Sequence, residues 1–183
     1  MARKKQPKSV YAPGPSEGKP KSHTLSLLVD NVPGTLSRIV GLFTGRGYNI
    51  DSLTVAETDH NNHIARITIV TQGTEKVLYQ ITTQLESLIP VRSVRDLTTH
   101  GDYIGRELSL IKVSLTRKTR SSVIEIGEKF GAAIVDSDGQ ACMFQISGKS
   151  GHIDDFIQAL RPHGIQDVSR SGIAALTSGT SGT

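Results

Sequence analysis

One short loop carries residues suited to binding a small carboxylate. Residues 31–34 read Asn-Val-Pro-Gly and lie between an expected strand and an expected helix. Backbone N–H groups at a helix start have no partner within the helix and carry partial positive charge, so they attract an anion. Gly34 has no side chain to obstruct a ligand, and Asn31 offers both a donor and an acceptor. An ordinary Asx turn has the same composition, so spacing alone leaves both interpretations open.

Two other groups of polar residues have the composition of metal sites but lack the full ligand sets. His60 and His63 lie three residues apart in a polar turn, with no Cys or carboxylate cluster to complete a zinc site. Asp136 and Asp138 resemble the start of a calcium loop, but the later ligands and the closing Glu are missing. Asp138 and Gly139 are already explained as a hairpin turn. We therefore expect no metal in this chain.

No set of residues predicts catalysis. Cys142 alternates with Phe144 and Ile146, which is typical of a buried strand position, and a single cysteine cannot form an internal disulfide. A small hydrolase would need a nucleophile with a converging base, and the sequence offers no such combination of Ser, His and carboxylate. The expectation is a protein without catalytic residues.

Charge is concentrated at the N-terminus. The 183-residue chain has a net charge of +4, and residues 1–22 hold six Lys or Arg against one Glu, with several Pro and Gly. This composition predicts a disordered basic arm, and the Gly/Ser/Thr-rich residues 177–183 predict a flexible tail. No apolar run approaches the roughly eighteen residues of a membrane span, and no secretory signal follows the first charges. We expect a cytoplasmic protein without a membrane partner.

Hydrophobic periodicity predicts a βαββαβ order in residues 23–98. Period-two alternation indicates strands near 24–30, 50–58 and 63–70, and a short one from 91 to about 97. Helical spacing indicates a first helix that Gly45 and Gly47 can end, and a second that stops before Pro90. The apolar stripe of the first helix consists of Leu36, Ile39, Val40 and Phe43.

The same order recurs in residues 106–176. Strands are expected near 108–115, from 132, across 142–146 and from about 165, with amphipathic helices between them. Gly47 and Gly131 occupy equivalent positions, each before the second strand of its unit. The sequence therefore predicts an α+β chain of two tandem ferredoxin-like units, joined by a short polar linker at 99–105.

Residues 31–55 resemble the first ACT domain of acetohydroxyacid synthase (acetolactate synthase) small subunits. The Pro-Gly and helix pattern is shared by ACT domains in general, whereas the run Arg-Gly-Tyr-Asn-Ile-Asp-Ser-Leu-Thr-Val at 46–55 is specific to this family. The resemblance continues through 107–113 to Ser-Arg-Ser-Gly at 169–172, and so covers nearly all of residues 23–176.

The resemblance implies a regulatory, non-catalytic subunit in branched-chain amino-acid biosynthesis. Such a subunit activates a separate catalytic subunit and confers feedback inhibition by valine. It implies a homodimer whose first domains pair side by side, with valine at the shared interface, and a second domain that contacts the catalytic subunit together with part of the first. Thiamine diphosphate, magnesium and FAD would belong to that catalytic partner, with no cofactor in this chain.

The expected valine site combines the loop, the helix start and a second segment. Val32, Leu36 and Ile50 could surround the apolar side chain, Ser37 would tune the loop, and the family match points to Asn49. The complete expected set is Asn31, Val32, Pro33, Gly34, Thr35, Leu36, Ser37, Asn49 and Ile50.

The equivalent loop of the second unit has a different composition. Residues 116–120 lack Pro-Gly and contain Arg117, Lys118 and Arg120, which could be a solvated loop or a contact for an acidic partner surface. The sensor is therefore expected in the first unit.

Of two alternatives to this interpretation, the composition of the strands excludes one. RNA-recognition modules share the βαββαβ order but need aromatic residues on their central strands, and strands 24–30 and 63–70 contain none. We expect no nucleic-acid partner for the folded region and only weak electrostatic binding by the arm. A sensor of another amino acid that acts on a different enzyme stays open. The preference for valine over isoleucine or leucine also stays open, since one methylene in an apolar pocket changes binding by only about 1–3 kcal/mol.

Overall fold

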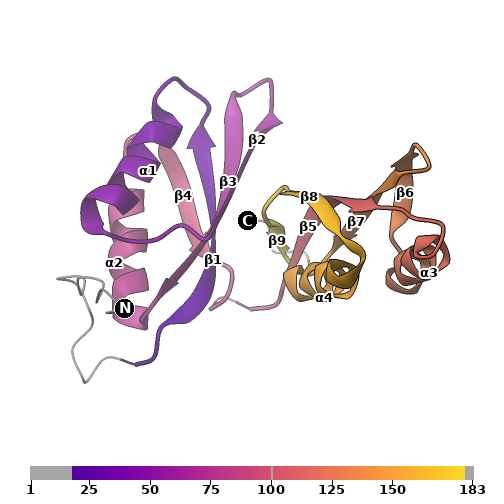
Figure 1. Ribbon diagram of the computed structural model, residues 1–183. Coiled ribbons are helices and arrows are strands. Elements are labelled where there is room, and N and C mark those ends of the chain that lie inside the picture. The colour runs from indigo at the N-terminus through magenta and orange to yellow at the C-terminus, as the bar shows by residue number, and fades with distance from the viewer. Residues whose placement is uncertain (1–17, 100, 180–183) are drawn as a thin grey trace, which may run out of the picture.

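A computed structural model describes residues 18–99 and 101–179 as two α+β domains (Figure 1). The first contains β1 (Lys21–Asp30), α1 (Thr35–Arg46), β2 (Ser52–Asp59), β3 (Ile64–Gly73), α2 (Glu75–Glu86) and β4 (Val91–Asp96). Its antiparallel sheet has the order β2-β3-β1-β4. Both helices cover one face of that sheet.

The core of the first domain follows the predicted periodicity. Leu25, Leu27 and Val29 of β1 are buried against the helices. The apolar stripes of α1 and α2 pack onto them through Ile39, Phe43, Ile81 and Leu85, each at most 1% exposed. Burying one such side chain fully contributes about 1.5–3 kcal/mol, so these stripes fix both helices on the sheet.

The second domain repeats this architecture with one additional strand. It contains β5 (Tyr103–Ser114), α3 (Arg120–Phe130), β6 (Ala133–Ser137), β7 (Ala141–Gly148), α4 (Ser150–Leu160), a 3-10 turn η1 (Arg161–His163), β8 (Ile165–Arg170) and β9 (Ala174–Thr177). The sheet order is β6-β7-β5-β8, and β9 pairs with β5. Gly47 and Gly131 end α1 and α3 with left-handed φ values of 70° and 69°. The predicted tandem ferredoxin-like fold is confirmed.

Three predicted boundaries differ from the structure. Lys21 and Ser22, assigned to the arm, belong to β1 and pair with Gly73 and Gln72 of β3. Residues 1–17 of the predicted arm lie outside the described residues, as do residues 180–183 of the predicted tail. Gly45 lies within α1, and the helix ends at Gly47.

The predicted linker 99–105 is partly strand. β5 begins at Tyr103, and Tyr103 to Arg106 pair with Ala174 to Thr177 of β9, which includes the first residue of the predicted tail. Both pairing segments are too short for a periodic pattern, and they lie about 70 residues apart in the chain. The hydrogen bonds between them, which no local pattern reports, define the strands.

The second domain meets the helix-free sheet face of the first domain through β9 and the start of β5, and the rest of the domain extends away from that face (Figure 1). Thr24, Ser26 and Thr68 on that face are each only 3% exposed. Thr24 Oγ1 lies 3.2 Å from the hydroxyl of Tyr103 in the second domain. No helix in residues 18–99 or 101–179 is long and apolar enough to cross a membrane.

Candidate functional site

The loop from Asn31 to Gly34 is held by the ends of the strands around it. The Asn31 amide donates to the carbonyl of His63 at 2.7 Å, and the Val32 amide donates to that of Asp30 at 2.9 Å. Thr35 is 5% exposed, and its hydroxyl donates to the Asp30 carbonyl at 3.0 Å. Of the predicted site residues, Thr35 therefore shapes the loop from inside, whereas Asn31, Val32, Pro33 and Gly34 are exposed.

The start of α1 remains open to a ligand. Gly34 is the N-cap with φ 86°, makes no side-chain cap and has nothing within 4 Å of the place where a Cβ would lie. Among the described residues, the amides of Leu36 and Ser37 have no hydrogen-bond acceptor, and the first turn contains no acidic side chain. An uncapped helix start is suited to a carboxylate.

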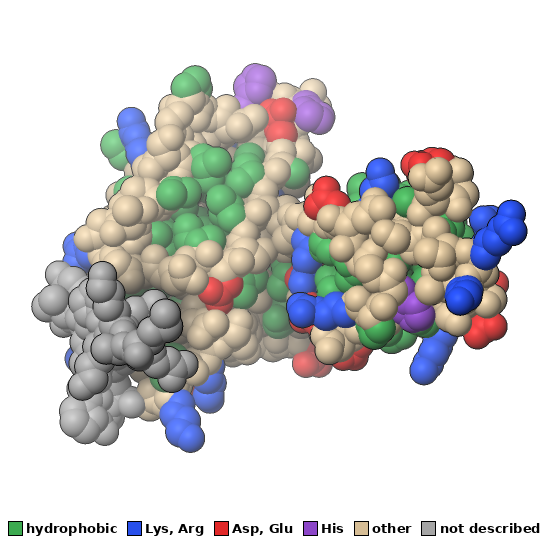
Figure 2. All heavy atoms as spheres, in the orientation of Figure 1, with side chains coloured by type: hydrophobic (Ala, Val, Ile, Leu, Met, Phe, Trp, Pro, Cys, Tyr) green, Lys and Arg blue, Asp and Glu red, His purple; other side chains and the backbone are tan. Residues whose placement is uncertain are grey.

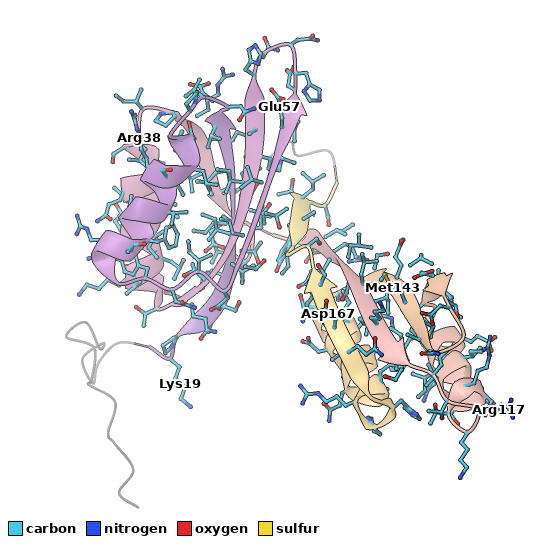
Figure 3. All side chains as sticks on the ribbon, turned by 45° about the horizontal axis from the view of Figure 1, so that its top comes forward. Lys19, Arg38, Glu57, Arg117, Met143 and Asp167 are labelled. Atoms are coloured by element: carbon cyan, nitrogen blue, oxygen red, sulfur yellow. The ribbon has the colours of Figure 1, made fainter. Side chains whose placement is uncertain are left out.

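Glu57 of β2 contacts this loop and was not predicted from the sequence. Its carboxylate accepts a hydrogen bond from the Asn31 side chain and lies 2.8 Å from His60 Nδ1 and 3.5 Å from His63 Nδ1. The Asn31 contact first, and then His60, lower the pKa of Glu57 below its ordinary value. Figure 3 shows Glu57 at the same end of the first domain as Arg38 of α1. The sequence signal for this contact is a carboxylate three residues before His60 of the polar turn.

Asn49 and Ile50 lie away from the loop within one chain. They follow Gly47 at the far end of α1, which has twelve residues and is thus about 18 Å long. The Asn49 carbonyl accepts from the Thr71 hydroxyl at 2.6 Å, and its side chain donates to Asp51 Oδ1 at 2.5 Å. Within one chain α1 separates Ile50 from Val32 and Leu36, so the expected pocket stays a prediction for the interface shared by two copies.

An apolar surface lies between these two groups. Leu36 of α1 is 39% exposed. Val55 is 43% exposed on β2, which is an edge strand of the sheet. Figure 2 shows hydrophobic side chains gathered between α1 and the sheet on this face. Large apolar side chains exposed next to unpaired strand edges are typical of an interaction surface.

The loop before α3 in the second domain closes on itself. The Thr116 amide donates to Thr119 Oγ1 at 3.1 Å, and the Thr119 amide donates to Thr116 Oγ1 at 3.2 Å. Arg117, Lys118 and Arg120 are exposed around it. Among the described residues, the amides of Ser121 and Ser122 at the start of α3 also have no hydrogen-bond acceptor, so the two loops differ in composition and charge rather than in open amides.

Comparison with known proteins identifies the family to which this chain belongs. A family model described as the AHAS small subunit-like ACT domain matches residues 25–93, and one described as the small subunit of acetolactate synthase matches residues 106–179. A probable acetolactate synthase small subunit of Methanothermobacter thermautotrophicus is 41% identical over 165 residues, which cover 90% of this chain and 97% of the relative. The chain belongs to the acetolactate synthase small-subunit family.

Other members of the acetolactate synthase small-subunit family agree in sequence and structure. The isozyme 3 small subunit of Escherichia coli K12 is 42% identical over 156 residues, covering 85% of this chain and 94% of the relative. A crystal structure of the small subunit from Thermotoga maritima superposes with a TM-score of 0.80 at 28% identity, covering 88% of this chain and 99% of that one. That superposition spans both domains, so the two domains have a similar relative arrangement in the Thermotoga maritima small subunit.

Proposed function

We propose that this chain is the regulatory subunit of an acetolactate synthase, without catalytic activity of its own. It activates the thiamine-diphosphate-dependent catalytic subunit and makes it sensitive to valine. Thiamine diphosphate, magnesium and FAD are assigned to that partner. The observation that carries the proposal is the uncapped start of α1 beside Asn31 in a small-subunit family member.

The proposed valine site is completed by a second copy of the chain. Antiparallel pairing of two β2 edges about a two-fold axis places the Ser52 end of one strand beside the Asp59 end of the other. Asn49 and Ile50 precede Ser52, whereas Asn31 and Glu57 lie at the opposite end. The pairing therefore brings Asn49 and Ile50 of one copy to the 31–37 loop of its partner.

The chemistry of the combined site suits an α-amino acid. The open amides of Leu36 and Ser37 accommodate the carboxylate, and the charge of Glu57 beside Asn31 favours the ammonium group. The exposed Val32 and Leu36 together with Ile50 surround an aliphatic side chain. Valine is proposed over a different amino acid because the chain belongs to the small-subunit family, and an ACT-domain sensor of another amino acid is the second candidate.

The second domain is proposed to contact the catalytic subunit, together with part of the first. Its loop at Arg117 and Lys118 presents exposed positive charge suited to an acidic partner surface.

Titration calorimetry and a reconstituted synthase assay test this function. The isolated chain with pyruvate and thiamine diphosphate should produce only background acetolactate. It should raise the activity of the catalytic subunit and bind valine, and valine should inhibit the complex. Acetolactate formation by the isolated chain, or valine binding no tighter than that of leucine, isoleucine and unrelated amino acids, would contradict the proposal.

A further inference from the structure

A cavity lies at the junction of the two domains, on the sheet face opposite the helices of the first domain. Its volume is about 550 Å³, within the range of small-molecule sites. The walls come from β2 and β3 of the first domain and from β5 and β9 of the second. The lining residues are Thr54, Ala56, Thr58, Arg66, Thr68, Ile104, Arg106 and residues 174–177.

The lining combines apolar walls with two cations. Ile104 and Leu176 are paired across β5 and β9 and are 55% and 53% exposed. Arg66 donates to the Ser26 hydroxyl at 2.8 Å, and Arg106 donates to the Gly105 carbonyl at 2.8 Å. No acidic residue lines the cavity, and within the described chain neither arginine forms a salt bridge.

The environment of Arg66 favours an anion. Burial removes this guanidinium partly from water and thereby lowers its pKa. No carboxylate beside it compensates for the lost hydration of the charge. A guanidinium binds a carboxylate through two parallel hydrogen bonds. The Thr68 hydroxyl, on the same face of β3 as Arg66, can donate to a further oxygen of the same ligand, whereas Thr54 and Thr58 already donate to the carbonyls of Ser171 and Ile64.

We propose that this cavity binds an aliphatic carboxylate that lacks an ammonium group, such as a branched 2-oxo acid. The two arginines take the carboxylate, the Thr68 hydroxyl donates to an adjacent carbonyl, and Ile104 and Leu176 cover the aliphatic body. With no carboxylate in the lining, an α-ammonium group has no counter-charge here. The site is separate from the proposed valine site, since Thr54, Thr58 and Arg66 lie on the face of the sheet away from α1.

The test is titration of the full chain with 3-methyl-2-oxobutanoate, in the presence of saturating valine. The wild type should bind one probe molecule per chain, with an affinity that falls as salt is raised. Arg106→Gln should weaken probe binding at least tenfold and leave valine affinity unchanged. Ala174→Leu should do the same by filling the cavity, and Ala174 is exposed, so the fold tolerates the larger side chain. Arg117→Gln removes an equal charge from the exposed loop before α3 and should leave probe binding intact.

Several results would overturn this proposal. They are absence of probe binding by the wild type, displacement of the probe by valine, or equal loss in the Arg117→Gln variant. If the wild type ignores the probe while Arg106→Gln loses the catalytic subunit, the cavity is a protein-docking groove instead. Arginine-dependent probe binding by a chain that does not bind valine would sustain this site and reject the proposed function.

Discussion

Thr54 of β2 donates a hydrogen bond from its hydroxyl to the backbone carbonyl of Ser171 in the second domain, at 3.2 Å. The neighbouring amide of Ile173 donates to Ser52 Oγ of the same strand, also at 3.2 Å. The strand that begins just after Asn49 and Ile50 is thus attached directly to the second domain. A displacement of β2 on ligand binding has a physical route to the domain proposed to contact the catalytic subunit.

Gly172 allows this attachment. Its φ is 78°, and an added Cβ would lie 2.7 Å from both Ser52 Oγ and Thr54 Oγ1. Gly172→Ala should therefore displace the loop from β2, lower the free energy of unfolding by about 1–3 kcal/mol and weaken the coupling between valine and synthase activity. Urea unfolding and hydrogen exchange of β2 measure these effects. Gly139→Ala is the matched control, because Gly139 has a φ of 87° and no atom within 4 Å of a Cβ.

Gly34→Asp should abolish valine binding while activation of the catalytic subunit persists. The new side chain has open space, and its carboxylate would accept from the amides of Leu36 and Ser37, where the ligand's carboxylate is proposed to bind. Asp tolerates the left-handed backbone better than most residues, so folding should be retained. Calorimetry should show at least about a tenfold loss of valine affinity, or 1.4 kcal/mol. Gly34→Ala repeats the backbone strain without the charge, and an equal loss in that variant would argue against a carboxylate site.

Asn31→Ala should raise the pKa of Glu57. The Asn31 side chain is the first cause of the lowered value, so the folded carboxylate stays ionised further into acid than it does in the unfolded chain. The stabilisation is therefore present above the ordinary carboxyl pKa and is lost as pH falls through the lowered folded pKa. A pH titration followed by NMR at the Glu57 side chain checks this shift. The Asp138 pKa, lowered by the Ala141 and Gln140 amides, is the internal control and should not change.

Val55→Lys should separate the homodimer proposed here. Val55 is 43% exposed on an edge strand, and two copies paired about a two-fold axis would bring like charges together. Sedimentation at micromolar concentration should shift from dimer toward monomer, and valine affinity should fall with it. Tyr79→Lys places the same charge on α2 at a side chain 73% exposed and should leave the dimer intact. A wild type that sediments as a monomer would remove the shared site.

Glu107→Gln should destabilise the second domain by about 2–4 kcal/mol. The Glu107 side chain is 6% exposed and accepts from Arg170 Nε at 2.8 Å and from the Ser150 hydroxyl, so the change leaves a partly buried guanidinium without its closest partner. Urea unfolding measures the loss. Arg92→Gln breaks the exposed 2.6 Å pair with Asp30 and should cost no more than about 1 kcal/mol. Equal losses would mean that burial of Glu107 does not decide the effect.

The sequence by itself determined the elements of each domain and the loop most suited to an anion. Helix stripes, strand alternation and the helix-ending Gly47 and Gly131 depend on neighbours within one element, so the chain order displays them directly. The position of Asn31 and Gly34 before α1 has the same local origin. The family resemblance added Asn49, which no spacing would have linked to that loop.

Only the tertiary structure decided which distant residues meet. It separated Asn49 and Ile50 from Asn31 by the length of α1, placed Glu57 against Asn31, and paired β9 with the start of β5. It also brought Arg66 and Arg106 to one cavity. These relationships depend on strand register and on the packing of one domain against the other. Several registers and packing arrangements are compatible with the same local pattern, so periodicity along the chain does not determine them.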